Sequence, residues 1–525
     1  MNRLFLDLLK RCSVAALVFS NAVSPAVLAN TPSSADVHLK RQLAAVEEHV
    51  SYVLKDSGVP GFAVGIISDG KVVFAKGFGF RDLEKKLPIT PETQFPLGSF
   101  TKCVTSMVVG MLVDDGLIDL DKPVRTYLPE FELKDPYRTL HTTVRDVLSM
   151  RTGLAPHNFM WIMSPTLTQD QVLRRLAHLD LPLGFREGFI YCNLSIFIGG
   201  CVASRAAGIP WEDVVRKRIL GPLDMTQSSL TIDELKRFPD YALPYNVSLG
   251  REFKPQLLEL AELNALRPTG SLNASTNDAL KWMRFLLDRG RVDGKELISR
   301  RMLDEMWIPH SAMWAPSENR VITGLEGYGL AWFVGTYRGN SMISHGGAAP
   351  GYHAFMAFFP DKNLGVFAVH NGSAFFADSV VKYICDLFLE AQPIDWYAAV
   401  KPELLAFEKL TGQPLARTPD TRPSRPLQDY AGDYTSPGYG SLVVTFKEGA
   451  LYGKYNDSEE FGLEHWHYDT FRSTRQLGWL GTPAALWLTP AFQADSTGRI
   501  IRLSLPLEPM VEEIVFSRKE FFLDS

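Results

Sequence analysis

Two groups of strand-like segments stand far apart in the sequence, with helical patterns between them. The first is a hairpin in which residues 62–67 and 72–75 flank Asp69-Gly70, a pair that suits a tight primed turn. The second group contains short apolar segments separated by turn residues: 328–334, 341–344, 353–359 and 365–369. Helical patterns and irregular loops fill residues 99–290. This arrangement predicts one mixed sheet closed by distant segments, with helices that cover it and form a separate lobe.

Helical patterns also lie outside these strands. Residues 37–57 repeat apolar side chains at three- and four-residue steps, and residues 376–391 have a similar pattern. A further amphipathic helix is expected near residues 280–287. Together with the strands, these helices place residues 30–400 in one domain of the α/β class.

The end of the chain has a different character. Residues 411–426 contain four prolines and almost nothing apolar, which is typical of a linker, and we place the linker at residues 401–426. Beyond it, several segments alternate apolar and polar residues: 440–446, 450–455, 500–506 and 512–516. This period of two predicts a separate β-rich, barrel-like domain over residues 427–525.

The N-terminus has the pattern of an export signal. Basic residues precede an apolar run over residues 12–20, and Val27-Leu-Ala29 offers small side chains where a signal peptidase cleaves. We therefore predict a signal peptide over residues 1–29, cleavage after Ala29, and a periplasmic or secreted protein. A short membrane anchor is the alternative. Because the run is shorter than the ~20 apolar residues of a spanning helix, we expect no stable membrane span.

Charge and cysteine usage narrow the function classes. The formal net charge is −5 and the pI is near 6.2, whereas nucleic-acid-binding proteins usually carry a basic excess, so no nucleic-acid partner is expected. Apart from Cys12 in the predicted signal, the cysteines are Cys103, Cys192, Cys201 and Cys385. They lack the CxxC spacing of a zinc ribbon. We expect mostly free, buried thiols, although an exported protein can also pair some of them.

One helical turn carries a candidate nucleophile and its base. In Ser99-Phe-Thr-Lys102, a helix that begins at Ser99 places the two polar side chains on one face. A serine hydroxyl becomes nucleophilic when a neighbouring base removes its proton, and a desolvated lysine can be that base. The helix N-terminus adds N–H groups and a positive dipole. Alone, Ser-x-x-Lys is a weak signal, since an amphipathic helix with an exposed lysine has the same pattern.

A second candidate segment is Tyr191-Cys-Asn193, which follows a turn-rich stretch. A tyrosine near a lysine cation can have a lowered pKa and is then a candidate general base. An asparagine can orient an amide or ester group, because its side chain both donates and accepts hydrogen bonds. A packed tyrosine and a turn asparagine are the structural alternative.

The third candidate segment is His345-Gly-Gly347, which follows a short strand. Glycines beside a strand let a substrate backbone approach closely. The N–H of Ala348 can complete an oxyanion hole with the N–H of Ser99, and a protonated His345 can bind a carboxylate. A β-bulge with an incidental histidine is the structural alternative.

Taken in order, Ser99-x-x-Lys102, Tyr191-x-Asn193 and His345-x-Gly347 resemble the motifs of the serine β-lactamase and penicillin-binding-protein superfamily. The resemblance is greatest to class C β-lactamase-like esterases and peptidases and covers roughly residues 37–392. Flanking segments also resemble the family: 96–102, 115–121, 143–153, 221–225 and 268–272. The resemblance implies a β-lactamase/transpeptidase-like fold, with an antiparallel mixed sheet flanked by helices and a helical lobe.

The same resemblance implies roles for these residues. Ser99 attacks a carbonyl carbon and becomes acylated, while Lys102 and Tyr191 share the acid–base work in a division that the sequence leaves open. The N–H groups of Ser99 and Ala348 hold the oxyanion, and Asn193 positions the acyl side chain. The implied substrate-binding residues are Asn193, His345, Gly347 and Ala348. No metal ion or cofactor is implied.

Departures from the family pattern narrow the substrate. The third motif often reads Lys-Thr-Gly in penicillin-recognising members, whereas His345-Gly346 supplies neither a fixed cation nor a hydroxyl at neutral pH. We therefore expect a serine hydrolase acting on esters or on amide and peptide bonds, as an esterase or D-amino-acid-type peptidase rather than an efficient β-lactamase. Cys192 replaces the serine common at its position, and we expect its side chain to point away from the substrate. Residues 427–434 are similar to a lipocalin-like domain appended to some of these hydrolases.

Other functions stay open at this point. The same fold without turnover would be a periplasmic module that binds peptidoglycan or β-lactams. An α/β-hydrolase is disfavoured because no serine lies in a Gly-x-Ser-x-Gly elbow, and a metallo-hydrolase because His465-Trp-His467 is only a pair. The expected partner is a small molecule or peptide with a carbonyl group, and a homo-oligomer is possible.

Overall fold

The computed structural model describes residues 34–249, 254–313, 323–411, 416–478 and 485–521. The predicted signal peptide, residues 1–29, lies outside the described residues. The chain divides into two compact units, residues 1–44 and residues 45–525. Apart from the beginning of helix α1 (Ser34–Ser57), the elements described below belong to the second unit.

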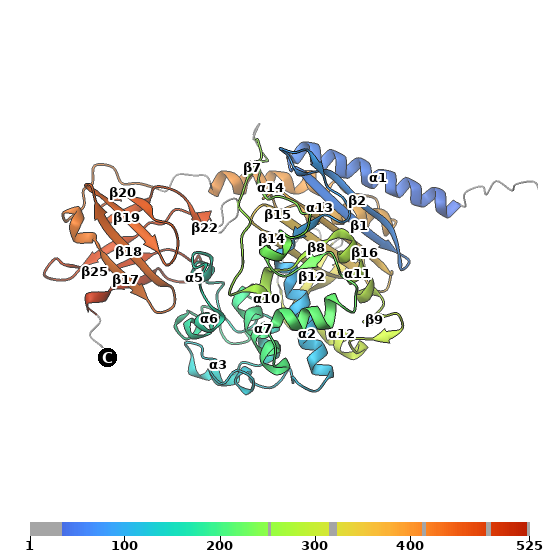
Figure 1. Ribbon diagram of the computed structural model, residues 1–525, viewed down its shortest axis with the longest axis horizontal. Helices are drawn as coiled ribbons and strands as arrows, with labels where there is room; N and C mark the ends of the chain where they lie inside the picture. The colour runs from blue at the N-terminus through green and yellow to red at the C-terminus, as the bar shows by residue number, and fades with distance from the viewer. Residues whose placement is uncertain (1–33, 250–253, 314–322, 412–415, 479–484, 522–525) are drawn as a thin grey trace, which may run out of the picture. The chain divides into compact units, whose positions relative to one another are not determined.

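A nine-stranded sheet forms the centre of the first domain, and every neighbouring pair of its strands is antiparallel (Figure 1). In spatial order the strands are β11 (Ser311–Ala312), β12 (Thr323–Tyr328), β13 (Phe333–Tyr337), β14 (Asn340–Ala349), β15 (Tyr352–Phe359), β16 (Leu364–His370), β1 (Gly61–Ser68), β2 (Lys71–Asp82) and β3 (Leu87–Pro88). Phe62 of β1 lies opposite His370 of β16. The N-terminal hairpin thus joins the later strands, as the sequence predicts.

Helices cover both faces of this sheet, which explains why β1 is buried on both sides. On one face, the Phe62 ring packs against Phe376, the residue before helix α13 (Ala377–Phe388). On the other face, a Cβ at Gly65 would lie 2.9 Å from Leu280 of helix α11 (Thr276–Leu287). Successive strand residues point to opposite faces, so the apolar run of β1 fits a strand covered twice.

The helical lobe is built around helix α2 (Thr101–Asp114), and 12 of its 14 residues are buried. Helix α7 (Asn193–Ala207) packs along it. Other helices of the domain are α3 (Pro136–His141), α4 (Val144–Leu148), α5 (Phe159–Ile162), α6 (Gln169–Arg175), α8 (Trp211–Val215), α9 (Ile232–Leu235), α10 (Arg267–Gly270) and α12 (Arg300–Met306). A helix that is apolar all round is a core helix, and this is the position of α2.

None of the helices in the described ranges has, by itself, the length and hydropathy to cross a membrane. Helix α7 and the segment Trp211–Leu220 reach these limits only as a pair, which is bent by 76°.

The last domain is a closed eight-stranded barrel (Figure 1). Its strands are β17 (Gly432–Ser436), β18 (Gly440–Lys447), β19 (Ala450–Tyr455), β20 (Phe461–His467), β21 (Thr470–Ser473), β24 (Ala491–Ala494), β25 (Ile500–Leu505) and β26 (Ile514–Arg518). Pairing of β17 with β26, with Tyr434 opposite Arg518, closes the ring. Alternating burial along β19 and β20 agrees with the period of two in the sequence, and inward side chains such as Leu442, Leu503 and Phe516 are fully buried.

Three expectations need correction. The predicted strand over residues 328–334 is interrupted, because β12 ends at Tyr328 and β13 begins at Phe333. The expected linker over residues 401–426 begins as helix, because α14 extends over Trp396–Thr411. The third motif does not follow a strand but lies inside β14. The expectation for the thiols is confirmed: Cys103, Cys192, Cys201 and Cys385 are free and buried.

Candidate active site

Ser99 lies where strand β4 (Gln94–Pro96) turns into helix α2. The turn Gly98–Phe100 joins the two elements, and Gly98 has a φ of +53°. A Cβ at Gly98 would lie 2.2 Å from the carbonyl oxygen of Ala348, and a Cβ at Gly347 would lie 1.9 Å from that of Leu97. Strand β14 therefore passes so close to the turn that only glycine fits at either contact.

The N–H of Ala348 faces this turn. Among the described residues, β13 pairs with β14 as far as Ser344, so beyond that point one edge of β14 faces the Ser99 turn instead of a strand. The Ala348 carbonyl points to Gly98 on this edge. In a strand, the N–H and C=O of one residue point to the same side. The backbone nitrogen of Ala348 therefore lies near the turn Gly98–Phe100, which carries Ser99 and leads into α2.

Lys102 lies one turn further along α2, and its side chain is fully buried. Its Nζ is 2.7 Å from the Oγ of Ser99 and donates to the carbonyl oxygen of Thr269 over 2.9 Å. None of the carboxylates in the described ranges forms an ion pair with it. Burial, which disfavours the charged form, lowers the pKa of Lys102 to about 7. A neutral amine is thus available near neutral pH, in direct contact with the partly exposed hydroxyl of Ser99.

Tyr191 stands on the other side of Lys102, just before α7. The Lys102 Nζ is 5.1 Å from the centroid of the Tyr191 ring, and the ring stacks on Phe333 at 6.4 Å. Burial raises the pKa of Tyr191 well above its ordinary value, against a smaller opposing effect of its hydrogen bond to Ser99. Of the two candidate bases, Lys102 is therefore the one whose pKa lies near neutrality, and Tyr191 keeps its proton.

A buried carboxylate holds the segment that leads to Tyr191. Asp146 is fully buried and accepts hydrogen bonds from Arg151 (2.6 Å) and from Arg186 (2.9 and 2.7 Å). The second of these arginines lies five residues before Tyr191. Ile190 also donates its N–H to the carbonyl oxygen of Met150. Bonds to a paired buried charge are strong and directional, so this network fixes the path of the chain into the site.

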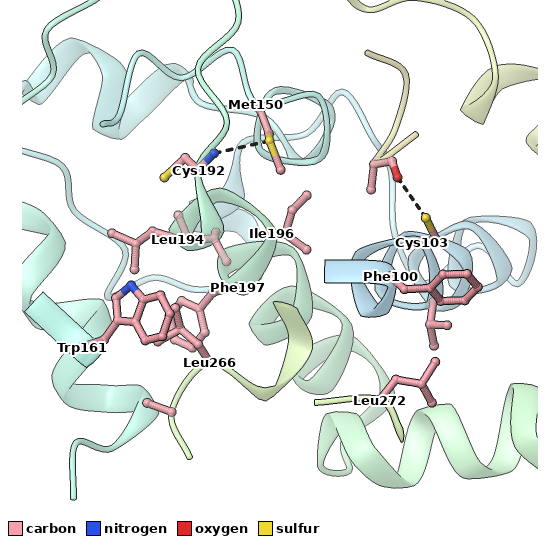
Figure 2. Close-up of a cluster of buried hydrophobic side chains, with 14 of the residues drawn as sticks. Phe100, Cys103, Met150, Trp161, Cys192, Leu194, Ile196, Phe197, Leu266 and Leu272 are labelled. Atoms are coloured by element: carbon pink, nitrogen blue, oxygen red, sulfur yellow. Dashed lines mark hydrogen bonds between the residues drawn. The ribbon is translucent and has the colours of Figure 1, made fainter. Parts of the chain in front are cut away.

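Cys192 points away from this side of the site, as expected. Its thiol is fully buried and donates to the carbonyl oxygen of Ala155 over 3.2 Å. Figure 2 shows its backbone N–H directed at the sulfur of Met150, which is 3.4 Å away. It belongs to the same buried apolar cluster as side chains of α7 and neighbouring segments: Leu194, Ile196, Phe197, Trp161 and Leu266. The residue belongs to the apolar packing behind Tyr191.

Asn193 is the first residue of α7 and is half-buried. Its Nδ2 donates to the Oδ1 of Asn158 over 3.3 Å. This bond uses one polar atom of the Asn193 carboxamide and leaves the rest of the group for other partners.

His345 is almost fully buried at 1% exposure. Its Nδ1 donates to the carbonyl oxygen of Gly346 (2.5 Å), which leaves Nε2 to accept from the hydroxyl of Tyr328 (3.2 Å). Burial, with a further contribution from the Lys102 charge, lowers the pKa of His345 to about 3. The ring is thus neutral at physiological pH and offers no cation to a substrate carboxylate.

Three residues contact the site although the motifs and their spacing in the sequence do not predict them. Thr269 contributes a backbone carbonyl, which any residue can supply, and the sequence singles out its segment only by resemblance. Tyr328 was expected within a strand, not as the partner of His345. Asn158 is an isolated asparagine in a loop, so its contact with Asn193 depends on the fold alone.

The sequence matches two protein families. Residues 46–387, more than half of the chain, match the family described as Beta-lactamase, and residues 416–518 match a domain of unknown function, DUF3471. Among curated proteins, an unguisins hydrolase of Aspergillus campestris is 26% identical, over 78% of this chain and 79% of its own length. Beta-lactamase-like protein 2 of Dictyostelium discoideum is 24% identical, over 82% of this chain and 77% of its own length.

Solved structures agree on the fold. The octameric penicillin-binding protein homologue from Pyrococcus abyssi superposes with a TM-score of 0.59 at 21% identity, covering 90% of this chain and all of that one. SurE superposes with a TM-score of 0.51 at 20% identity, covering 91% of this chain and 99% of that one. At these identities the likeness concerns the fold. With the family match over residues 46–387, it shows that the chain belongs to the β-lactamase family and carries an appended C-terminal barrel domain.

Proposed function

We propose that this protein is a serine hydrolase that cleaves esters or amide bonds through an acyl-enzyme on Ser99. The observation that carries the proposal is the 2.7 Å contact between the Ser99 Oγ and the Nζ of a buried lysine whose pKa is about 7. A base with a pKa near the working pH is the most effective at taking a proton from a nucleophile. The relatives named as hydrolases support the same reaction type.

In the proposed first step, the Ser99 Oγ forms a bond to the substrate carbonyl carbon while its proton passes to the neutral amine of Lys102. The carbonyl oxygen becomes an oxyanion, and the N–H groups of Ser99 and Ala348 donate to it. The tetrahedral intermediate then expels the leaving alcohol or amine, which takes a proton from the Lys102 ammonium. This transfer passes through Tyr191: its phenol, protonated in the resting site, gives its proton to the leaving atom and takes the proton of the Lys102 ammonium in return.

In the second step, water attacks the acyl carbon and gives a proton to Lys102. Collapse of this second intermediate returns the proton to the Ser99 Oγ and releases a carboxylic acid. The site is thereby restored, and atoms and protons balance over the cycle. The carboxamide of Asn193 binds an amide group on the acyl side of the substrate.

The chemistry of the third motif favours esters and neutral amides over β-lactams. His345 is neutral, and Gly346 supplies no hydroxyl, so neither residue provides the fixed cation that a β-lactam carboxylate requires. The Pyrococcus abyssi homologue is octameric, which supports a homo-oligomer as a further proposal; light scattering of the purified protein checks it.

A substrate panel on the purified protein tests this function. We expect hydrolysis of p-nitrophenyl acetate and other short esters, measurable cleavage of D-alanyl peptides or amides, and poor turnover of a chromogenic cephalosporin. A fluorophosphonate probe should label the protein, because it reacts with an activated serine. Folded protein that neither labels nor turns over any member of the panel would instead be the non-catalytic binding module.

Export is proposed from the N-terminal pattern alone. Cleavage after Ala29 makes Asn30 the first residue of the mature chain. N-terminal sequencing of the protein recovered from a periplasmic or culture fraction checks this. Retention of Met1 in that fraction would contradict cleavage.

A further inference from the structure

The loops at one end of the C-terminal barrel carry three buried polar side chains. Neighbouring strands of the barrel run in opposite directions, so alternate connections lie at the same end. Tyr439 precedes β18, Tyr455 ends β19, and Glu508 lies between β25 and β26, which places all three at one end. Their exposures are 2%, 1% and 6%, although two are in connecting loops. Something other than the barrel strands therefore covers them.

What covers them is the segment His157–Phe159 of the hydrolase domain. The Tyr439 hydroxyl is 2.6 Å from the Nδ1 of His157. Glu508 accepts the backbone N–H of Phe159 through Oε1 over 2.8 Å. The Tyr455 hydroxyl shares its proton between the carbonyl oxygen of Tyr439, at 3.1 Å, and that of Phe159, at 3.4 Å. Both backbone polar groups of Phe159 thus lie within hydrogen-bonding distance of barrel side chains. Such pairing is what buried backbone groups require.

This segment needs support from outside. His157 is fully buried and has a φ of +44°, a left-handed conformation that is uncommon for a residue with a side chain. Its Nε2 is 2.9 Å from the carbonyl oxygen of Asp180, so Nε2 donates there and Nδ1 accepts from Tyr439. Hydrogen bonds at both ring nitrogens hold the strained residue in place.

Asn158 lies between His157 and Phe159, the two residues that the barrel contacts, and it is hydrogen-bonded to Asn193 of the candidate active site. Its Oδ1 accepts from the Nδ2 of Asn193, the carboxamide that we assign to the acyl side of the substrate. The charge of Glu508 also acts on Cys192, the residue before Asn193. Burial, with a smaller contribution from the Glu508 charge, raises the pKa of Cys192 to about 11. The barrel and the substrate-binding carboxamide are therefore separated by one residue of the chain and one hydrogen bond.

We propose that the barrel is a positioning part of the hydrolase site, in which Tyr439, Tyr455 and Glu508 fix residues 157–159 and thereby orient Asn193 through Asn158. This inference rests on the proposed function, because it assigns the barrel to the acyl-side half of the same site. It gives the C-terminal domain a role in substrate discrimination. The three barrel residues are positioning residues, since the contacts above join them to residues 157–159 and not to the substrate.

Two substitutions at position 508 test the proposal. Glu508→Ala removes the acceptor of the Phe159 N–H, whereas Glu508→Gln keeps an acceptor oxygen of similar reach. The substrates are a matched pair: p-nitrophenyl acetate, which has no acyl-side amide, and the p-nitrophenyl ester of N-acetyl-D-alanine, which has one. We expect Glu508→Ala to lower kcat/KM for the amide-bearing ester about tenfold more than for the acetate, since one positioning hydrogen bond is lost. Glu508→Gln should restore most of the difference.

Two further variants separate positioning from stability. Tyr439→Phe removes a single hydroxyl at the same contact and should produce the same selective loss. Tyr434→Phe is the matched control, because Tyr434 is equally buried but its hydroxyl donates to Tyr430 within the barrel. This control should change both esters alike. In an Asn193→Ala background, the selective effect of Glu508→Ala should vanish, because the two residues act through one path.

Equal losses on both esters, with or without a lower melting temperature, would overturn the inference and make the contact merely structural. No loss in either Glu508→Ala or Tyr439→Phe would also overturn it. A wild-type protein that hydrolyses neither ester and takes no fluorophosphonate label on Ser99 would instead remove the proposed function, and the inference with it.

Discussion

Replacing Ser99 by alanine should abolish turnover while leaving the fold intact. The Oγ is the atom that forms the acyl bond, and no other hydroxyl in the described ranges contacts the Lys102 Nζ. Loss of a nucleophile costs about 10³-fold or more in kcat, and what remains comes from the oxyanion donors and substrate binding. We expect kcat/KM for p-nitrophenyl acetate to fall at least ~10³-fold, with loss of fluorophosphonate labelling.

The matched control for this variant is Ser106→Ala. Ser106 is a buried serine on the same helix, and its hydroxyl donates to the carbonyl oxygen of Leu330 over 2.6 Å. Its loss should cost about 1 kcal/mol of unfolding free energy and leave labelling in place. Circular dichroism and thermal melting establish that both variants are folded. Wild-type rates in folded Ser99→Ala would refute the nucleophile assignment.

Replacing Lys102 by methionine should have an effect of similar size and should also change the pH profile. In the wild type, burial lowers the pKa of Lys102 to about 7. Below that pH the amine is an ammonium and cannot accept the Ser99 proton; above it the amine is neutral and can. We therefore expect kcat/KM for p-nitrophenyl acetate to rise with pH through about 7, tenfold per unit on the acid side, and then to level off.

In Lys102→Met the base is absent, so kcat/KM should fall about 10³-fold and the step in the profile near neutrality should disappear. The variant leaves the carbonyl of Thr269 without the lysine donor, at a cost of about 1–3 kcal/mol, so melting is measured alongside the rates. Lys362→Met, at an exposed lysine far along the chain, is the control and should keep the wild-type profile. If kcat/KM of the wild type instead rises with pH around the pKa of a tyrosine phenol, Tyr191 and not Lys102 is the base.

Local patterns predict those parts of the fold that depend on local rules. Asp69-Gly70 sits in the turn between β1 and β2, and the spacing of Ser99 and Lys102 requires nothing beyond one helical turn. The same rules misplace residues 328–334. Leu330, Ala331 and Trp332 are as buried as any strand residue, but Ala331 has a φ of +62° and the segment is a buried turn. An apolar run reports burial, and burial does not distinguish a strand from a packed turn.

Contacts between segments that are far apart in the sequence leave no local pattern from which they could be predicted. Tyr191 and His345 join the candidate site in the sequence only through resemblance to a family, because nothing local shows which loops meet. Glu508 and Tyr439 are single polar residues in barrel loops, and their partners at 157–159 lie hundreds of positions away. A hydrogen bond between two isolated residues has no periodicity, so only the folded chain reveals it.

Pairing of β17 with β26 closes the C-terminal barrel, so none of its eight described strands has a free edge. Free edges are where a sheet recruits strands from other molecules and begins to aggregate. A closed ring meets its neighbours through loops and side chains instead. Loop sequences at its end can therefore diverge, or be exchanged in the laboratory, while the strand pairing of the barrel is kept, and under the proposed role of the barrel such exchanges would change selectivity without altering Ser99 or Lys102.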